Sequence, residues 1–213
     1  MPTALYRERG RSDAGHADIL REQIDTGAAR RTAACGRARH STLAGVTADA
    51  APHPPEEVRA AVERYHAARR RIDDGLEPDG FASLADFYTD DAVYVDAAWG
   101  RIEGKAAIAH WLAHSMVGLE DWRFPIEFTA VEGDDVVVKW TQVIPGAKAD
   151  GSPYTQSAYS RLRYSGAGKF CYEEDTYNMV HVLEDVAASG WRPSEPMNAP
   201  PQHPDRNWSL PEA

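Results

Sequence analysis

One acidic residue, Asp96, ends a short apolar run and is followed directly by a turn. Residues 87–96 (FYTDDAVYVD) indicate a helix end and a short strand, and residues 99–105 (WGRIEGK) indicate a turn and a new helix. A carboxylate flanked by apolar residues at a strand end often has its pKa raised by desolvation. An Asp with a raised pKa is suited to proton transfer near neutral pH. We therefore treat Asp96 as a candidate general base.

A second carboxylate, Asp175, lies in the last expected strand, at residues 169–177. Alternation along a strand places Asp175 and Tyr177 on the same face. If that face lines a cavity, Asp96 and Asp175 form a carboxylate pair whose environments pull their pKa values apart. The alternative is that Asp96 caps the turn before the next helix and Asp175 lies at a solvated rim.

The elements that position these residues belong to one expected domain at residues 53–190. Apolar spacing predicts helices over 54–72, 81–88 and 104–116, and a terminal helix over 178–189. Period-two alternation predicts strands over 93–96, 122–129, 136–144, 154–165 and 169–177. Helices followed by a meander of antiparallel strands imply an α+β fold. We expect a curved, cone-shaped antiparallel sheet wrapped on about three N-terminal helices, which would leave an apolar pocket.

The two ends of the chain differ from this domain. Residues 1–52 are rich in Ala, Arg, Gly and Thr and contain one aromatic residue, Tyr6, so we expect a disordered extension. Residues 191–213 form a Pro-rich segment, which predicts a loop-like tail pinned by Trp191 or Trp208.

Composition excludes several classes of partner. The net charge of -10 argues against nucleic acid and against anionic membrane surfaces, which both require clustered basic residues. No apolar run approaches the length of a spanning helix. The two cysteines, Cys35 and Cys171, stand in dissimilar contexts and suggest neither a disulfide framework nor a zinc site, so we expect a cytoplasmic protein.

From Tyr65 to about Val182 the chain resembles the nuclear transport factor 2-like superfamily. It is most similar to the branch of SnoaL-like polyketide cyclases and steroid Δ5-isomerases. Three blocks carry the resemblance: residues 88–92 (YTDDA), residues 95–108 with Asp96 and the run IEGK, and residues 174–178 (EDTYN).

The resemblance implies roles for individual residues. Asp96 occupies the place of the catalytic base of steroid isomerases, and Tyr65 fits their oxyanion-binding Tyr loosely. Their second donor, a protonated Asp, falls here on Ser160. Asp175 resembles the last-strand Asp of polyketide cyclases and limonene epoxide hydrolases. The hydrolases also need an Arg-x-Asp sequence, and residues 139–141 read Lys-Trp-Thr instead, so a hydrolase is the less favoured enzyme.

The remaining polar and aromatic residues have simpler interpretations. Trp122, Phe124 and Phe128 are expected in the core, and Trp99, Trp140, Ser160 and Tyr177 are expected to contact a substrate. His110 and His114 have ligand spacing but lack the Glu of a zinc motif, so we expect no metal and no cofactor. The three arginines at 69–71 are expected at an exposed helix end.

The sequence is consistent with two functions that belong to different classes. The first is a cofactor-free isomerase or cyclase in which Asp96 takes a proton from a small apolar molecule, Tyr65 donates to the enolate and Asp175 assists. The second is a non-catalytic ligand-binding or dimerisation module, since one fold hosts many roles. The resemblance also implies a homodimer.

Overall fold

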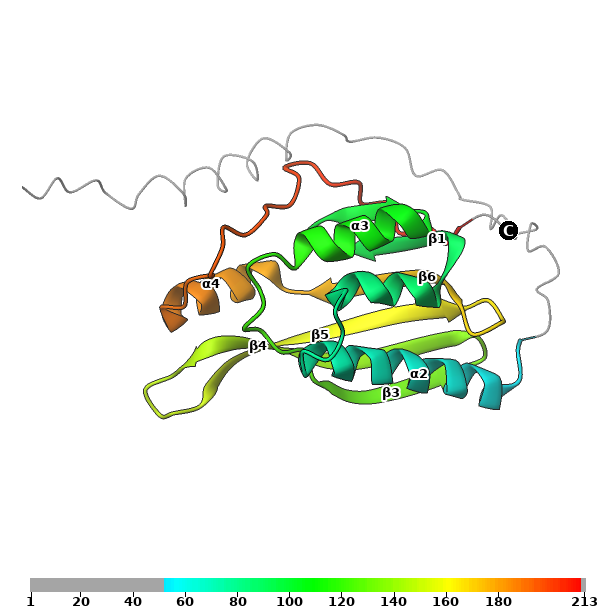
Figure 1. Cartoon of the computed structure of the whole chain (residues 1–213), viewed down its shortest axis with the longest axis horizontal. Coiled ribbons are helices and arrows are strands. Elements are labelled where there is room, and N and C mark those ends of the chain that lie inside the picture. Colours follow the sequence, from blue (N-terminus) through cyan, green and yellow to red (C-terminus); the bar gives the residue numbers. More distant parts are fainter. Residues whose placement is uncertain (1–51, 212–213) are drawn as a thin grey trace, which may run out of the picture. The chain divides into compact units, whose positions relative to one another are not determined.

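The computed structural model describes residues 52–211, and the predicted N-terminal extension lies outside the described residues apart from Pro52. Four helical segments and six strands make up this part of the chain (Figure 1). In chain order they are α2 (Pro55–Asp73), the 3-10 helix η1 (Gly80–Phe87), β1 (Tyr88–Asp96), β2 (Gly100–Glu103), α3 (Lys105–Ser115), β3 (Ile126–Glu132), β4 (Asp135–Ala147), β5 (Pro153–Tyr164), β6 (Phe170–Tyr177) and α4 (Met179–Ser189).

The six strands form one curved, open sheet in the order β2-β1-β6-β5-β4-β3. This α+β architecture confirms the predicted fold class. Every neighbouring pair is antiparallel except β1 and β6, which run parallel. Parallel neighbours need a long crossover connection, and the helix α3 with the strands β3 to β5 supplies it. Strand β2 was not predicted, because four residues are too few to display a readable alternation.

The helices α2, η1 and α3 cover one face of the sheet (Figure 1). Helix α2 begins with Pro55 at its first position and two glutamates in its first turn, which suit the positive end of the helix dipole. Its buried residues include Val58, Val62 and Tyr65, which recur at helical spacing and face the sheet. The second predicted helix is present as the 3-10 helix η1.

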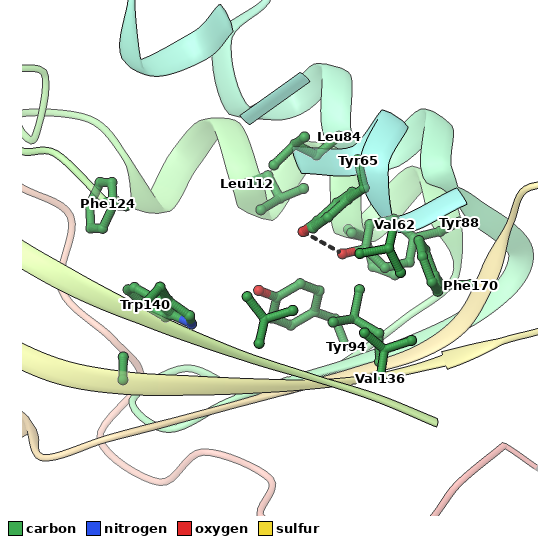
Figure 2. Packing of buried hydrophobic residues seen from close by; sticks show 14 of the residues in the cluster. Val62, Tyr65, Leu84, Tyr88, Tyr94, Leu112, Phe124, Val136, Trp140 and Phe170 are labelled. Atoms are coloured by element: carbon green, nitrogen blue, oxygen red, sulfur yellow. Dashed lines mark hydrogen bonds between the residues drawn. The ribbon is translucent and has the colours of Figure 1, made fainter. Parts of the chain in front are cut away.

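The main core lies between these helices and the sheet (Figure 2). Tyr65 and Leu112 point from the helical side, and Tyr94 and Trp140 point from the strands, into one apolar layer. Trp122 and Phe124 are buried as predicted.

Phe128 contradicts its predicted core position. Its side chain is 52% exposed, because the register between β3 and β4 shifts between Ile126 and Phe128. A one-residue shift turns every following side chain to the opposite face of the sheet.

The segment after α4, residues 190–211, has no helix or strand but is held closely by the domain. The backbone N–H of Arg101 donates to the carbonyl of Asp205 at 2.9 Å, and the Tyr172 hydroxyl donates to the carbonyl of Trp208 at 3.1 Å. Leu210 packs against Val93, Val95 and Tyr172 on the outer face of β1 and β6. The tail therefore covers the central strands where the helices do not. The ring of Trp191 also packs on Trp122, so it pins the tail as predicted, whereas the Trp208 side chain is 43% exposed.

Gly100 is expected to control how closely the tail approaches β2. A Cβ atom at this position would overlap the carbonyl oxygen of Asp205, and the backbone has a φ of +80°. We predict that Gly100→Ala lowers the free energy of unfolding by about 1–3 kcal/mol more than the strain of the positive φ alone. Urea unfolding of the full chain measures this difference.

Gly75→Ala is the matched control, because Gly75 has a φ of +68° and a Cβ atom there would have no heavy atom within 4 Å. Both substitutions impose the strain of a positive φ, but only the new Cβ atom at position 100 contacts the tail. Equal losses of stability in the two variants would contradict the close contact at Gly100.

Candidate active site

A cavity of about 360 Å³ lies between the helices and the sheet. Its walls are mostly apolar and come from α2, η1, α3, the sheet, α4 and the tail. Of the predicted site residues, Tyr65, Asp96, Trp99, Trp140, Asp175 and Tyr177 line it. A volume of this size suits a small organic molecule.

Asp96 lies at the end of β1, and the residue is 6% exposed. Its Oδ1 accepts hydrogen bonds from the backbone N–H groups of Ala98 and Trp99, each at 2.8 Å, and the Tyr177 hydroxyl donates to both oxygens at 3.0 Å. Burial raises the pKa of Asp96, and the donors from Trp99, Ala98 and Tyr177 partly offset this effect. The residue therefore does both things considered from the sequence: it caps the turn and it lines the cavity.

Asp175 comes from the middle of the sheet, on β6, and is 7% exposed. The Tyr94 hydroxyl donates to its Oδ2 at 2.7 Å, and the Ser160 hydroxyl donates to its Oδ1. Burial, and then the charges of Glu173 and Asp96, raise the pKa of Asp175 to about 8. At neutral pH this side chain is mostly a neutral carboxylic acid, which makes it a potential proton donor.

Glu173 is a third acid of this region that the sequence analysis missed. It lies two residues before Asp175 on the same face of β6 and is fully buried. The hydroxyls of Tyr65, at 3.1 Å, and of Tyr88 donate to it, and the hydroxyl of Tyr94, whose proton is directed to Asp175, lies 3.4 Å away. Burial raises the pKa of Glu173. The alternation that paired Asp175 with Tyr177 places Glu173 on the same face, so the signal was present in the sequence.

Tyr65 and Ser160 have different surroundings from those expected of substrate-binding groups. The hydroxyl of Tyr65 is directed to Glu173 and also lies 3.3 Å from the hydroxyl of Tyr88, as the dashed line in Figure 2 marks. Ser160 is 1% exposed and does not line the cavity. Its hydroxyl accepts a hydrogen bond from Nε1 of Trp140 at 2.9 Å and donates to Asp175, so it orients one wall residue and one acid.

The prediction that all three arginines at 69–71 lie at an exposed helix end is wrong for Arg69. Arg70 and Arg71 are exposed as expected, but Arg69 is buried and lines the cavity. Its guanidinium carbon lies 5.4 Å from the centre of the Trp140 ring, a cation–π arrangement. Arg69 follows Tyr65 by four residues, which is one helical turn, so its position on the buried face was readable from the spacing.

Two kinds of feature are absent from residues 52–211. No helix in this range is both long and apolar enough to cross a bilayer. No three His, Cys, Asp or Glu side chains gather there in an arrangement that could hold a metal ion. His110 and His114 are exposed on α3 with their rings stacked, on the outer face that the sequence predicted.

Comparison with protein families identifies the class of the domain. The profile of the SnoaL-like domain matches residues 62–172, which is just over half of the chain, so the protein belongs to the SnoaL-like family. This confirms the resemblance inferred from the sequence. No curated protein is significantly similar to the chain.

Solved structures that are similar to this chain include proteins with different names. A protein assigned to the SnoaL-like polyketide cyclases, from Jannaschia sp. CCS1, is 16% identical, with 62% of this chain and 93% of that chain covered and a TM-score of 0.49. A Catenulispora acidiphila protein with a ketosteroid isomerase-like fold is 21% identical, with coverage of 65% and 98% and a TM-score of 0.45. An LEH-like epoxide hydrolase from M. tuberculosis is 17% identical, with coverage of 63% and 92% and a TM-score of 0.46.

The raised pKa of Asp175 has a consequence for stability. Between about pH 4 and pH 8 the folded protein keeps a proton on Asp175 that the unfolded chain releases, because its unfolded value is 3.8 and its folded value about 8. This group therefore stabilises the fold at low pH, and its contribution is lost as the pH rises through 8. The slope approaches about 1.4 kcal/mol per pH unit.

We predict that Asp175→Asn, which cannot ionise, makes the stability less dependent on pH between 4 and 8. Chemical denaturation at several pH values measures this slope. The control is Glu174→Gln, which removes a carboxyl from the opposite face of the same strand. A wild-type slope in the Asp175→Asn variant would show that Asp175 is ionised in the folded protein at neutral pH.

Proposed function

We propose that the protein is a cofactor-free enzyme of the isomerase or cyclase type. It would move a proton at a carbon atom next to a carbonyl group in an apolar cyclic molecule, such as a steroid, polyketide or terpenoid. The observation that carries this proposal is the presence of two buried acids, Asp96 and Asp175, on the wall of one mostly apolar cavity. Family membership is consistent with it, although one fold supports many functions.

Asp96 would act as the base. Its carboxylate is oriented by two backbone N–H groups and by Tyr177, so little reorganisation is needed when it takes a proton. Burial raises its pKa, which strengthens the carboxylate as a base. In the step we propose, the C–H bond breaks, the proton moves to Asp96, and the electron pair forms an enolate on the substrate.

Asp175 would act as the acid. Its pKa of about 8 keeps a proton available at neutral pH, and this proton can be given to the substrate later in the reaction. Two carboxyls whose environments give them different protonation states are a common basis for acid and base roles. Tyr65, the third predicted catalytic residue, can donate to an enolate only by leaving Glu173.

Two other functions receive less support. A hydrolase of the limonene epoxide type would need an Arg-x-Asp sequence, but Lys139 and Thr141 both bind the exposed Glu127, and neither lines the cavity. A purely ligand-binding module would use the same cavity without turnover. Salt-bridging of Asp96 to Arg101 would have favoured such a module, but Arg101 pairs with Glu103 at 2.5 Å.

We predict that Asp96→Asn reduces turnover by about 100- to 10,000-fold while the protein stays folded, because the amide cannot accept the proton. Cyclic enones, lactones and epoxides form the substrate panel, and product formation is followed by chromatography. Asp90→Asn is the matched control, since it makes the same chemical change on the same strand at an exposed position. Full turnover by Asp96→Asn would exclude Asp96 as the base, and no turnover of any substrate by the wild type would favour the binding module.

We also propose that the protein forms a homodimer through the outer face of β3, β4 and β5. Phe128, Val137 and Tyr159 are exposed there by 52%, 39% and 44%, and Lys139 lies opposite both aromatic residues in the sheet. Apolar side chains gathered on one exposed face are typical of association sites.

We predict that Tyr159→Glu converts the dimer to a monomer, because two like charges would face each other across a symmetric interface. Light scattering coupled to size-exclusion chromatography measures the mass. Leu76→Glu is the control, since Leu76 is 59% exposed and follows α2, away from this face. A monomeric wild type would refute the interface.

A further inference from the structure

Arg69 is a buried cation with no hydrogen-bond acceptor and no ion-pair partner in the described part of the chain. Only 8% of the side chain is exposed. Among residues 52–211 no hydrogen bond acceptor and no carboxylate oxygen within 4.0 Å pairs with its guanidinium. Its guanidinium lies over the face of the Trp140 ring, and both residues line the cavity. A guanidinium stays charged in proteins and has five N–H donors, so a buried one without acceptors is costly unless a ligand supplies them.

The acids nearest to Arg69 do not satisfy it. Asp73, one turn further along α2, and Glu173 and Asp175 on β6 all act on Arg69 through their charges, but within the described residues none of the three reaches ion-pair distance. The oxygens of Glu173 are already occupied by the hydroxyls of Tyr65, Tyr88 and Tyr94. The donors of Arg69 are therefore available to a molecule in the cavity rather than committed to the protein.

The charges around the cavity restrict what this molecule can be. Burial raises the pKa of both Glu173 and Asp175, and that of Asp175 to about 8, so Asp175 is mostly neutral near neutral pH. An ionised Asp96 balances the single positive charge of Arg69. A permanently anionic ligand would add a further negative charge beside these buried acids. A neutral carbonyl compound would not, because its oxygen becomes negative only as the proton reaches Asp96 and neutralises that carboxylate.

We propose that Arg69 binds the carbonyl oxygen of the substrate and stabilises the negative charge that forms on it. This inference rests on the proposed function and deepens it. When Asp96 takes the proton, the C–H electron pair becomes the new C=C bond and the carbonyl π electrons move to the oxygen, where Arg69 donates to it. The total charge of the cavity stays constant. The substrate class is then an enolisable ketone or ester rather than a carboxylic acid.

This arrangement gives Tyr65 a different role from the predicted donation to the enolate. Tyr65 stays bound to Glu173 and helps hold that acid in place, and Arg69, one helical turn further along α2, takes the oxyanion position. A charged donor is also stronger than a neutral hydroxyl when it meets an oxyanion.

Binding of para-nitrophenolate to the full chain tests the proposal without any known substrate. This planar oxyanion resembles an enolate, and its absorbance differs from that of the neutral phenol. The measurements use the Asp96→Asn background, because an amide has the same charge as the protonated base that is present beside the enolate. We expect the phenolate to bind more tightly than para-nitroanisole, which has no ionisable oxygen. Adding Arg69→Met should weaken phenolate binding about 10- to 100-fold and leave para-nitroanisole binding unchanged.

Three further variants make the outcome specific. Arg70→Met removes an exposed charge from the next position of the same helix and should leave both affinities unchanged. Arg69→Lys should retain part of the phenolate preference, since it keeps the charge but not the planar donors. If Arg69 serves only to neutralise Glu173, then Glu173→Gln in the Asp96→Asn background should abolish the effect of Arg69→Met. That result would overturn the proposal.

The wild-type cavity provides a test that does not depend on whether Arg69→Met folds. Equal binding of para-nitrophenolate and para-nitroanisole to the Asp96→Asn protein would refute an oxyanion site at Arg69. Such a result would leave the base role of Asp96 standing, because that role is measured by turnover. Conversely, if Asp96→Asn kept full turnover while the phenolate was still preferred, the base role of Asp96 would be refuted and the oxyanion site at Arg69 would stand.

Discussion

The burial of Glu173 is the constraint on which the rest of the site depends. An acid with no exposed surface must have its oxygens satisfied, and three tyrosine hydroxyls from α2 and β1 converge on it. These bonds tie the first helix to the parallel pair of strands at the centre of the sheet. They also fix Tyr94 between Glu173 and Asp175, so the position of one acid depends on that of the other.

The same burial determines the chemistry available at the cavity. Because Glu173 lies two residues from Asp175 in a region shielded from solvent, the two acids raise each other's cost of ionisation, and Asp175 holds a proton at neutral pH. Burial also raises the pKa of Asp96, but this acid receives backbone donors that favour its ionised form. In the proposed mechanism, the acid and the base are therefore the same residue type, distinguished by their surroundings.

The C-terminal tail, residues 190–211, covers part of the domain without forming a helix or a strand. It has no regular structure, yet its residues bind the edge strand β2 and cover the outer face of β1 and β6. Residues 197–200 also line the cavity, so one segment contributes to the packing of the sheet and to the wall of the site. Since parallel strands are normally buried on both faces, this cover explains why the central pair can be parallel.

Local patterns in the sequence were sufficient for the fold class, for most helices and strands, and for the acids that end or interrupt apolar strands. Asp96 and Asp175 could be found because strand periodicity and flanking residues are local properties. Phe128 could not be placed correctly, because its exposure follows from a register shift between two strands.

The sequence by itself determined which residues share a face of a helix or strand, including Glu173 with Asp175 and Arg69 with Tyr65. Only the tertiary structure decided which of these faces meet around the cavity and which donors each acid receives. The physical reason is that pKa values and unpaired charges depend on burial and on neighbours distant in the chain. Those neighbours are defined once the sheet has curved against the helices.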